Sequence, residues 1–250
     1  TGAYGDRFFG DEFHWAACEL FATTQQEKYK TFSSSVDEKK LIVPSWSNVE
    51  LLGYYTLLRH STSLQLSVGD VDMMSNAVLY LADSISRSAD SRSFKTVMGG
   101  SAKDFVWGSS AVAANQGILM LQAYKLSGDR RYLNFALSNL DYLLGRNATG
   151  YSYVTGYGDK TPMHPHHRPS VADGIVEPVP GLLVGGPNPG KQDGCTTYTS
   201  SAADEAFTDD DCSYASNEIA INWNAPLVYL VSAVEWYHSS NTQLEEINKD

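Results

Sequence analysis

The sequence of 250 residues lacks several features that define large classes of protein. It contains no apolar run of about 18 residues, so we expect neither a membrane-spanning helix nor a membrane partner. It contains no block of like charge and no low-complexity tract, which excludes a disordered acidic tail. Positive charge is in deficit, since 18 Lys+Arg stand against 29 Asp+Glu for a formal net charge of −11. This balance argues against nucleic acid as a partner.

Cysteine is also scarce, with three residues in the whole chain, Cys18, Cys195 and Cys212. So small a set cannot form the framework of a disulfide-stapled secreted domain. At most one bridge is available: Cys195 and Cys212 could pair, help to hold a metal, or remain buried free thiols. The first residues lack the basic start and apolar stretch of a secretion signal, so any signal peptide is expected to be absent from this chain.

The sequence is rich in helical periodicity. Over residues 70–85, apolar side chains recur at alternating steps of three and four, which is typical of an amphipathic helix with one buried face. Similar patterns predict five further helices, at residues 12–22, 46–58, 107–126, 130–144 and 226–237. Residues 127–129 alone link two of them, and so short a link predicts antiparallel neighbours. Because alternating strand patterns are scarce, the predicted class is all-α.

One long region shows no sustained helical period. Residues 145–216 contain ten of the twenty glycines and seven of the nine prolines. Structureless connections longer than about 12 to 15 residues are uncommon in compact domains and are usually functional. A disordered linker is the alternative, but the many Tyr, His and hydrophobic residues of this region argue against it. We therefore expect a long functional loop region.

Two groups of polar residues stand out in and after this region. His164, His166, His167 and Arg168 lie among prolines, which restrict the backbone and suggest a preorganised site. Further on, three consecutive aspartates at 209–211 precede Glu218 in an aromatic setting. A run of three Asp is by itself typical of a solvated turn or a cation ligand.

Glu218 precedes the last predicted helix, which Asn224 can cap with Pro226 in its first turn. A carboxyl group beside Tyr214 and Trp223 lies in surroundings that suit a proton donor. Aromatic rings for sugar faces, His and Arg donors for hydroxyls, and carboxylates for acid and base steps together indicate carbohydrate chemistry.

Two stretches carry a specific resemblance to a known family. The first contains Ser152, Val154, Thr155, Gly158, Lys160, Pro165, His166 and Arg168, and the second contains Phe207, Asp209, Tyr214, Glu218, Ala220, Asn224 and Ala225. The chain resembles the C-terminal portion of the catalytic domain of glycoside hydrolase family 9, the cellulases with an (α/α)6 barrel. The likeness is clear from about residue 107 to 236 and weaker before it.

The resemblance implies part of an (α/α)6 barrel, about half of its twelve helices, over residues 1–250. It implies a secreted or extracellular endo-β-1,4-glucanase that acts on cellulose or β-glucan oligosaccharides by inversion, with Glu218 as the general acid. Asp209 and His166 would be further active-site residues, and Arg168 would bind sugar hydroxyls with His166. Further substrate-binding candidates are His167, Tyr214, Trp223, Trp107 and Trp46, of which Trp107 and Trp46 are equally interpretable as core aromatics.

One departure from the family is large. Its members carry the general base on an Asp-x-Gly-Asp type motif, and no such motif occurs in these 250 residues. The expectation is therefore a fragment whose base lies in an N-terminal half, which would be its partner across exposed apolar faces. Three alternatives stay open: a shortened relative that no longer hydrolyses by the family mechanism, a glucan-binding module without activity, and a purely structural half. If the chain acts alone, Asp209 is the candidate base.

The start of the chain resembles a calcium site of the family. Thr1 and Gly2 would offer backbone carbonyls, and Asp11 and Glu12 would offer carboxylates, the hard oxygen ligands that calcium needs. Asn48 is a further candidate ligand. Without the resemblance, Asp11 and Glu12 are first-turn acids favoured by the helix dipole. No organic cofactor is expected, and the spacing of the His and Cys residues matches no common zinc pattern.

Overall fold

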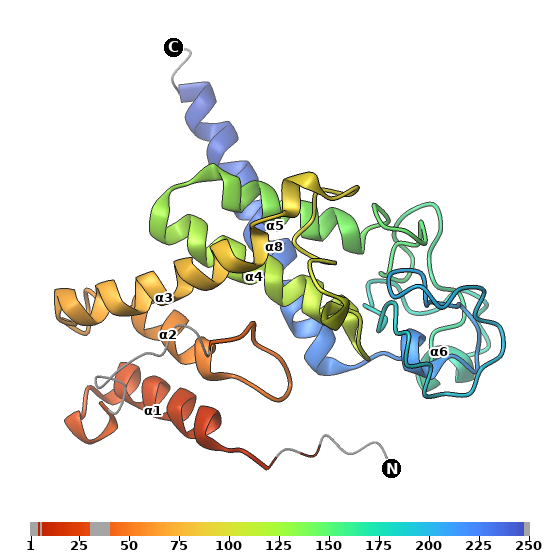
Figure 1. Cartoon of the computed structure of the whole chain (residues 1–250), viewed down its shortest axis with the longest axis horizontal. Coiled ribbons are helices and arrows are strands. Elements are labelled where there is room, and N and C mark those ends of the chain that lie inside the picture. The colour runs from red at the N-terminus through yellow and green to blue at the C-terminus, as the bar shows by residue number, and fades with distance from the viewer. Residues whose placement is uncertain (1–4, 6, 31–40, 248–250) are drawn as a thin grey trace. The chain divides into compact units, whose positions relative to one another are not determined.

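A computed structural model of the chain describes residues 5, 7–30 and 41–247 (Figure 1). Within these ranges the regular elements are helices, and β-pairing is confined to isolated bridges. The all-α prediction is therefore confirmed for this part of the chain. Two compact units are present, Thr1–Arg87 with Gln122–Asp129, and Ser88–Leu121 with Arg130–Asp250.

The six helices predicted from periodicity are all present. They are α1 (Gly10–Thr24), α2 (Glu50–Arg59), α3 (Val68–Ser86), α4 (Ser109–Ser127), α5 (Arg130–Leu143) and α8 (Ile221–Ile247). Three short 3-10 helices also occur, η1 (Glu27–Tyr29), η2 (Ala89–Ser91) and η3 (Ala102–Asp104). No helix in the described ranges has both the length and the apolar character needed to cross a membrane.

Two predicted helix starts are wrong, one because of a local turn and the other because of a tertiary contact. α2 begins at Glu50 rather than Trp46, because a bridge between Ser45 and Asn48 closes a turn before it. α8 begins at Ile221, so Pro226 lies inside the helix and Asn224 is not its cap. The Asn224 side chain instead accepts a hydrogen bond from Leu183 N (2.8 Å) and donates one to Leu183 O (3.3 Å).

In the first unit, α1 packs closely on α2. Gly53 allows this approach, since a Cβ at that position would lie 2.8 Å from the sulfur of the buried Cys18. The Asp11 carboxylate accepts a hydrogen bond from Val49 N (2.7 Å), which ties the start of α2 to the first turn of α1. Ser67 caps α3 by accepting a hydrogen bond from Asp70 N (3.1 Å).

In the second unit, the first part of α4, residues 109–121, lies beside α5. Asn139 of α5 is fully buried and donates a hydrogen bond to Ala113 O of α4 (2.9 Å). Residues 128–129 join the two helices, which is the short link found in the sequence. α8 contacts α5, and Leu230 of α8 packs against Gly117 of α4, where a Cβ would lie 2.9 Å from the leucine side chain.

The region of residues 145–216 is an ordered loop region rather than a linker. Two short helices interrupt it, α6 (Arg168–Ala172) and α7 (Tyr214–Asn217), which are too brief to leave a periodic pattern in the sequence. Single bridges pair Val154 with Leu183 and Val184 with Ile219. Backbone pairing therefore folds the region back on itself and onto the segment that precedes α8.

The structure decides between the alternatives left open for cysteine. Cys195 and Cys212 form a disulfide with a Cα–Cα distance of 5.4 Å, which joins two parts of the loop region. Cys18 is a buried free thiol, and burial raises its pKa to about 12. A thiol of that kind is chemically inert at neutral pH.

Candidate active site

Glu218 lies directly after α7, in an extended backbone conformation, with its side chain half-buried. The indole Nε1 of Trp107 donates a hydrogen bond to Glu218 Oε2 (3.1 Å). Trp107 precedes α4 and remains 37% exposed, so its side chain contacts both the Glu218 carboxyl group and the solvent. The fold therefore joins two residues that are 111 positions apart in the sequence.

Two aromatic contacts extend this pair. The ring of Tyr214, the first residue of α7, lies 5.7 Å from that of Trp107 and 5.8 Å from that of His166. The backbone at His166 forms a parallel β-bridge with the backbone at Glu218, in which His166 N donates a hydrogen bond to Asn217 O (2.8 Å). Glu218, Trp107, Tyr214 and His166 thus form one cluster.

The Asp209 carboxylate binds the backbone next to this cluster. Its Oδ2 accepts a hydrogen bond from Met163 N (2.7 Å), and its Oδ1 accepts from His164 N (2.9 Å) and from Asn217 Nδ2 (2.9 Å). Three donors stabilise the carboxylate and hold the 163–164 backbone beside α7. A general base must take a proton from water, and a carboxylate so engaged is poorly placed for that step.

Asn217 is a site residue that the sequence reasoning missed. It is fully buried, and its Nδ2 also donates to His164 O (2.7 Å), so its amide joins the histidine segment to Asp209. Within the described part of the chain, its Oδ1 has no hydrogen-bond partner. The only signal in the sequence is its position directly before Glu218, which by itself predicts no such role.

The remaining substrate-binding candidates differ in accessibility. Arg168 is exposed at the start of α6, and His167 Nδ1 lies 2.8 Å from the Ser170 hydroxyl. Trp46 is 47% exposed in the first unit. Trp223 is only 3% exposed and packs against Gly108, where a Cβ would lie 2.6 Å from the indole nitrogen. A ring buried in this way offers little surface for a sugar to stack on.

Comparison with known proteins identifies the family. The model of Glycosyl hydrolase family 9 matches residues 1–231. This chain belongs to glycosyl hydrolase family 9. The predicted resemblance to the C-terminal portion of the family 9 catalytic domain is thereby confirmed. The predicted fold, part of an (α/α)6 barrel, is confirmed as well.

Individual family 9 relatives are similar over nearly the whole chain. A xyloglucan-specific endo-beta-1,4-glucanase of Bacteroides ovatus, BoGH9A, is 44% identical over 237 residues, 94% of this chain and 40% of that protein. A solved Bacteroides ovatus GH9 structure has 42% identity and a TM-score of 0.81, covering 94% of this chain and 41% of that one. The structure of AaCel9A in complex with cellobiose-like isofagomine has 35% identity and a TM-score of 0.80, covering 94% and 45%. The chain thus spans about two fifths of the length of these relatives.

Of the expected calcium ligands in this family 9 chain, Thr1 and Gly2 lie outside the described residues. Asp11 is buried. Its Oδ2 accepts the bond from Val49 N, and its Oδ1 has no hydrogen-bond partner among the described residues. Glu12 follows in the first turn of α1. A buried carboxylate oxygen without a donor fits a hard cation, because leaving it unpaired costs free energy. Asn48 uses its backbone carbonyl to accept from Ser45 N (2.9 Å).

A second group of side chains of metal-ligand type lies close together in the loop region. Cys195, Asp210 and Cys212 offer ligand atoms that all lie within 4.8 Å of one another. The two sulfurs are bonded to each other, and a disulfide sulfur is not the thiolate that binds zinc. In the oxidised form this group is therefore a cross-link.

Proposed function

We propose that this chain forms the acid side of a β-1,4-glucanase active site, in which Glu218 protonates the glycosidic oxygen. The observation that carries the proposal is the hydrogen bond from Trp107 Nε1 to Glu218 Oε2 (3.1 Å) within the cluster of Tyr214 and His166. The indole fixes one carboxyl oxygen, and the other is left to deliver a proton. The names of the family 9 relatives, endo-β-1,4-glucanases, support this assignment.

The same cluster accounts for substrate binding. The exposed ring of Trp107 and the half-buried ring of Tyr214 would stack on glucose units, and His166 and Arg168 would donate hydrogen bonds to sugar hydroxyls. We propose cellulose or a related β-glucan as the substrate. The cellobiose-like ligand of the similar AaCel9A structure supports a glucan, and the name of BoGH9A extends the class to xyloglucan.

The general base is proposed to come from outside these 250 residues. An inverting enzyme needs acid and base carboxyl groups roughly 6.5 to 9.5 Å apart, so that a water fits beside the anomeric carbon. The engaged carboxylate of Asp209 supports a positioning role instead. Exposed apolar side chains on α8, among them Val228 and Trp236, would meet the N-terminal part of the catalytic domain.

A structural calcium ion and an extracellular location belong to the same proposal. Asp11 and Glu12 would hold the ion with carbonyl oxygens of Thr1 and Gly2, and the unpaired Asp11 Oδ1 supports this. The ion would cross-link the start of the chain to α1. The disulfide between Cys195 and Cys212 supports secretion, since such bonds persist in oxidising compartments.

Reducing-sugar release from carboxymethyl cellulose tests the proposal. The purified chain is assayed beside Glu218→Gln and Asp211→Asn, alone and together with the N-terminal part of a family 9 catalytic domain. We expect Glu218→Gln to lower turnover by about 10²–10⁴-fold. Asp211→Asn, at a carboxylate whose side chain is 80% exposed, should leave turnover unchanged.

Two results would contradict parts of this proposal. Full activity in Glu218→Gln would remove the acid assignment. Binding of cello-oligosaccharides by the chain without turnover, even with the N-terminal part present, would favour the alternative function of a glucan-binding module.

A further inference from the structure

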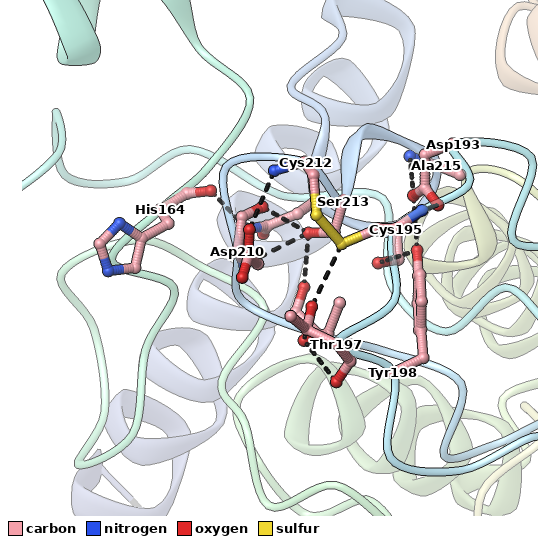
Figure 2. The surroundings of a disulfide bond; sticks show 12 residues. His164, Asp193, Cys195, Thr197, Tyr198, Asp210, Cys212, Ser213 and Ala215 are labelled. Carbon is pink, nitrogen blue, oxygen red and sulfur yellow. Dashed lines mark hydrogen bonds between the residues drawn. A yellow bond between two sulfur atoms is a disulfide. The ribbon is translucent and has the colours of Figure 1, made fainter.

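The disulfide between Cys195 and Cys212 lies beside a carboxylate at a distance suited to metal binding (Figure 2). One oxygen of Asp210 and the two sulfurs lie within 4.8 Å of one another. Sulfur and carboxylate oxygen are both zinc ligands, and the usual number of protein ligands in an open zinc site is three. The group therefore has the right donors and number, provided that the sulfurs are thiolates.

Hydrogen bonds hold these residues in place independently of the bond between the sulfurs. Asp210 Oδ1 accepts from Cys212 N (3.1 Å), which keeps the carboxylate beside that cysteine. Cys195 N donates to Asp193 Oδ1 (3.0 Å), and the Cys195 sulfur lies 3.1 Å from the Thr197 hydroxyl. Cleavage of the disulfide alone leaves these backbone contacts available, so both cysteines would remain near Asp210.

The two neighbouring aspartates cannot take the place of Asp210. Asp209 is occupied by Met163 N, His164 N and the Asn217 amide. Asp211 has a side chain that is 80% exposed, and its Oδ1 lies 3.5 Å from His164 Nδ1. Asp210 is thus the member of the acidic run that faces the sulfurs, and Asp211 provides a matched control.

We propose that, after reduction of the disulfide, Cys195, Cys212 and Asp210 bind one zinc-type divalent cation, with a fourth position left to water. Two thiolates on one zinc ion lie about 3.8 Å apart, given Zn–S bonds of about 2.3 Å and tetrahedral angles. Side-chain rotation provides that separation, because Cys212 is exposed and Cys195 half-buried. The same exposure admits both the reductant and the metal.

The chemistry balances in two steps. A phosphine reductant transfers two electrons to the disulfide and becomes a phosphine oxide, with its oxygen taken from water, and the two protons of that water give two thiols. The cation then binds two thiolates and releases two protons to solvent. No step uses Glu218, so the test of this metal site is independent of the proposed glucanase activity.

A metal at this position would replace the disulfide as a cross-link beneath α7. The segment around Cys195 supports that four-residue helix, because Asp193 Oδ2 accepts from Ala215 N (3.0 Å) and Tyr198 Oη contacts Ser216 Oγ (3.0 Å). The segment around Cys212 leads directly into α7. The disulfide in the oxidised chain and the bound metal in the reduced chain would therefore both stabilise α7, the helix that precedes Glu218.

Cobalt titration of the intact chain tests the site. Co²⁺ is added to the chain before and after phosphine reduction, and thiolate-to-cobalt charge transfer is followed in the near ultraviolet with proton release. We expect a band that saturates at one Co²⁺ with two protons released, only after reduction, and that Zn²⁺ displaces. The buried Cys18, a free thiol in both states, cannot produce this dependence on reduction.

Three variants assign the ligands. Cys195→Ser should abolish the band. Asp210→Asn should weaken cobalt binding by at least about tenfold, since loss even of outer-shell partners costs 10–100-fold. Asp211→Asn should bind as the parent does. No band in a reduced chain that keeps its far-ultraviolet circular dichroism, or equal binding by Asp210→Asn and Asp211→Asn, would overturn the proposal.

Hydrogen exchange tests the cross-link. The amides of Ser216 and Asn217, which both donate to Ser213 O, should exchange faster after reduction and regain protection when Zn²⁺ is added. Metal binding without recovered protection would overturn the structural role of the ion.

Discussion

The helices and the loop region of the second unit are stabilised in different ways. α4, α5 and α8 bury apolar side chains such as Leu119, Leu143 and Leu230, each with no exposed surface. The loop region also buries apolar side chains such as Tyr153 and Leu183, but it adds many buried polar ones, among them Asn188, Ser213 and Ser216. Apolar burial is non-directional, whereas a buried polar group is stable only when its hydrogen-bond partners are in place. The loop region is therefore the more sensitive to exact geometry, and Glu218 follows directly after its last helix, α7.

α7 shows the contrast most clearly. A helix of four residues is too short to be stable by itself. Asn188 Nδ2 donates to Ala215 O (2.9 Å), Gly186 N donates to Ser216 O (2.8 Å), and Asp193 accepts from Ala215 N. Surrounding loops thus supply the support that a longer helix derives from its own turns.

The largest expected effect is on stability and comes from the apolar packing of the helices. Leu230→Ala removes a fully buried side chain that packs against Gly117, and should lower the free energy of unfolding by about 2–5 kcal/mol. Val228→Ala, at a position 65% exposed on the same helix, is the control and should change little. Urea denaturation measures both, and equal effects of the two variants would contradict the apolar account of the helices.

A smaller but more local effect is expected at Asn217. Asn217→Ala leaves His164 O and Asp209 without the amide donor and should cost about 1–3 kcal/mol. Hydrogen exchange should increase at His166 N, whose acceptor is Asn217 O, while α4 and α5 stay protected. Asn115→Ala, which removes one bond to Ala111 O within α4, is the control. A uniform loss of protection across the unit would show that the two regions are not separately stabilised.

The smallest effect concerns a titrating group among the helices of the first unit. Burial lowers the pKa of His14, against the opposing influence of the Glu50 and Asp11 carboxylates. The unfolded chain therefore binds a proton at higher pH than the folded chain, so His14 makes stability fall as pH drops below about 6.5. Thermal melting between pH 7 and 5 should show a weaker decline in His14→Gln than in the parent. An unchanged decline would assign the pH dependence to other groups.

Sequence periodicity was sufficient for the long helices because each must bury one face, and that need leaves a regular pattern. It failed at the starts of α2 and α8, where residues distant in the sequence provide hydrogen bonds. Before α2, Val49 N donates to Asp11, and in α8 the Asn224 side chain accepts from Leu183 N. It also left α6 and α7 unseen, since elements of four or five residues have no period to read.

The sequence by itself determined the all-α class, the six long helices and, through two spaced motifs, the family and the residues around Glu218. Only the tertiary structure decided which of them meet. It joined Trp107 to Glu218, assigned Asp209 and Asn217 to anchoring the histidine segment, buried Trp223, and paired Cys195 with Cys212. The physical reason is the distance along the sequence over which each interaction acts. Helix periodicity is a local property, whereas hydrogen bonds between loops depend on how segments far apart in the sequence are brought together.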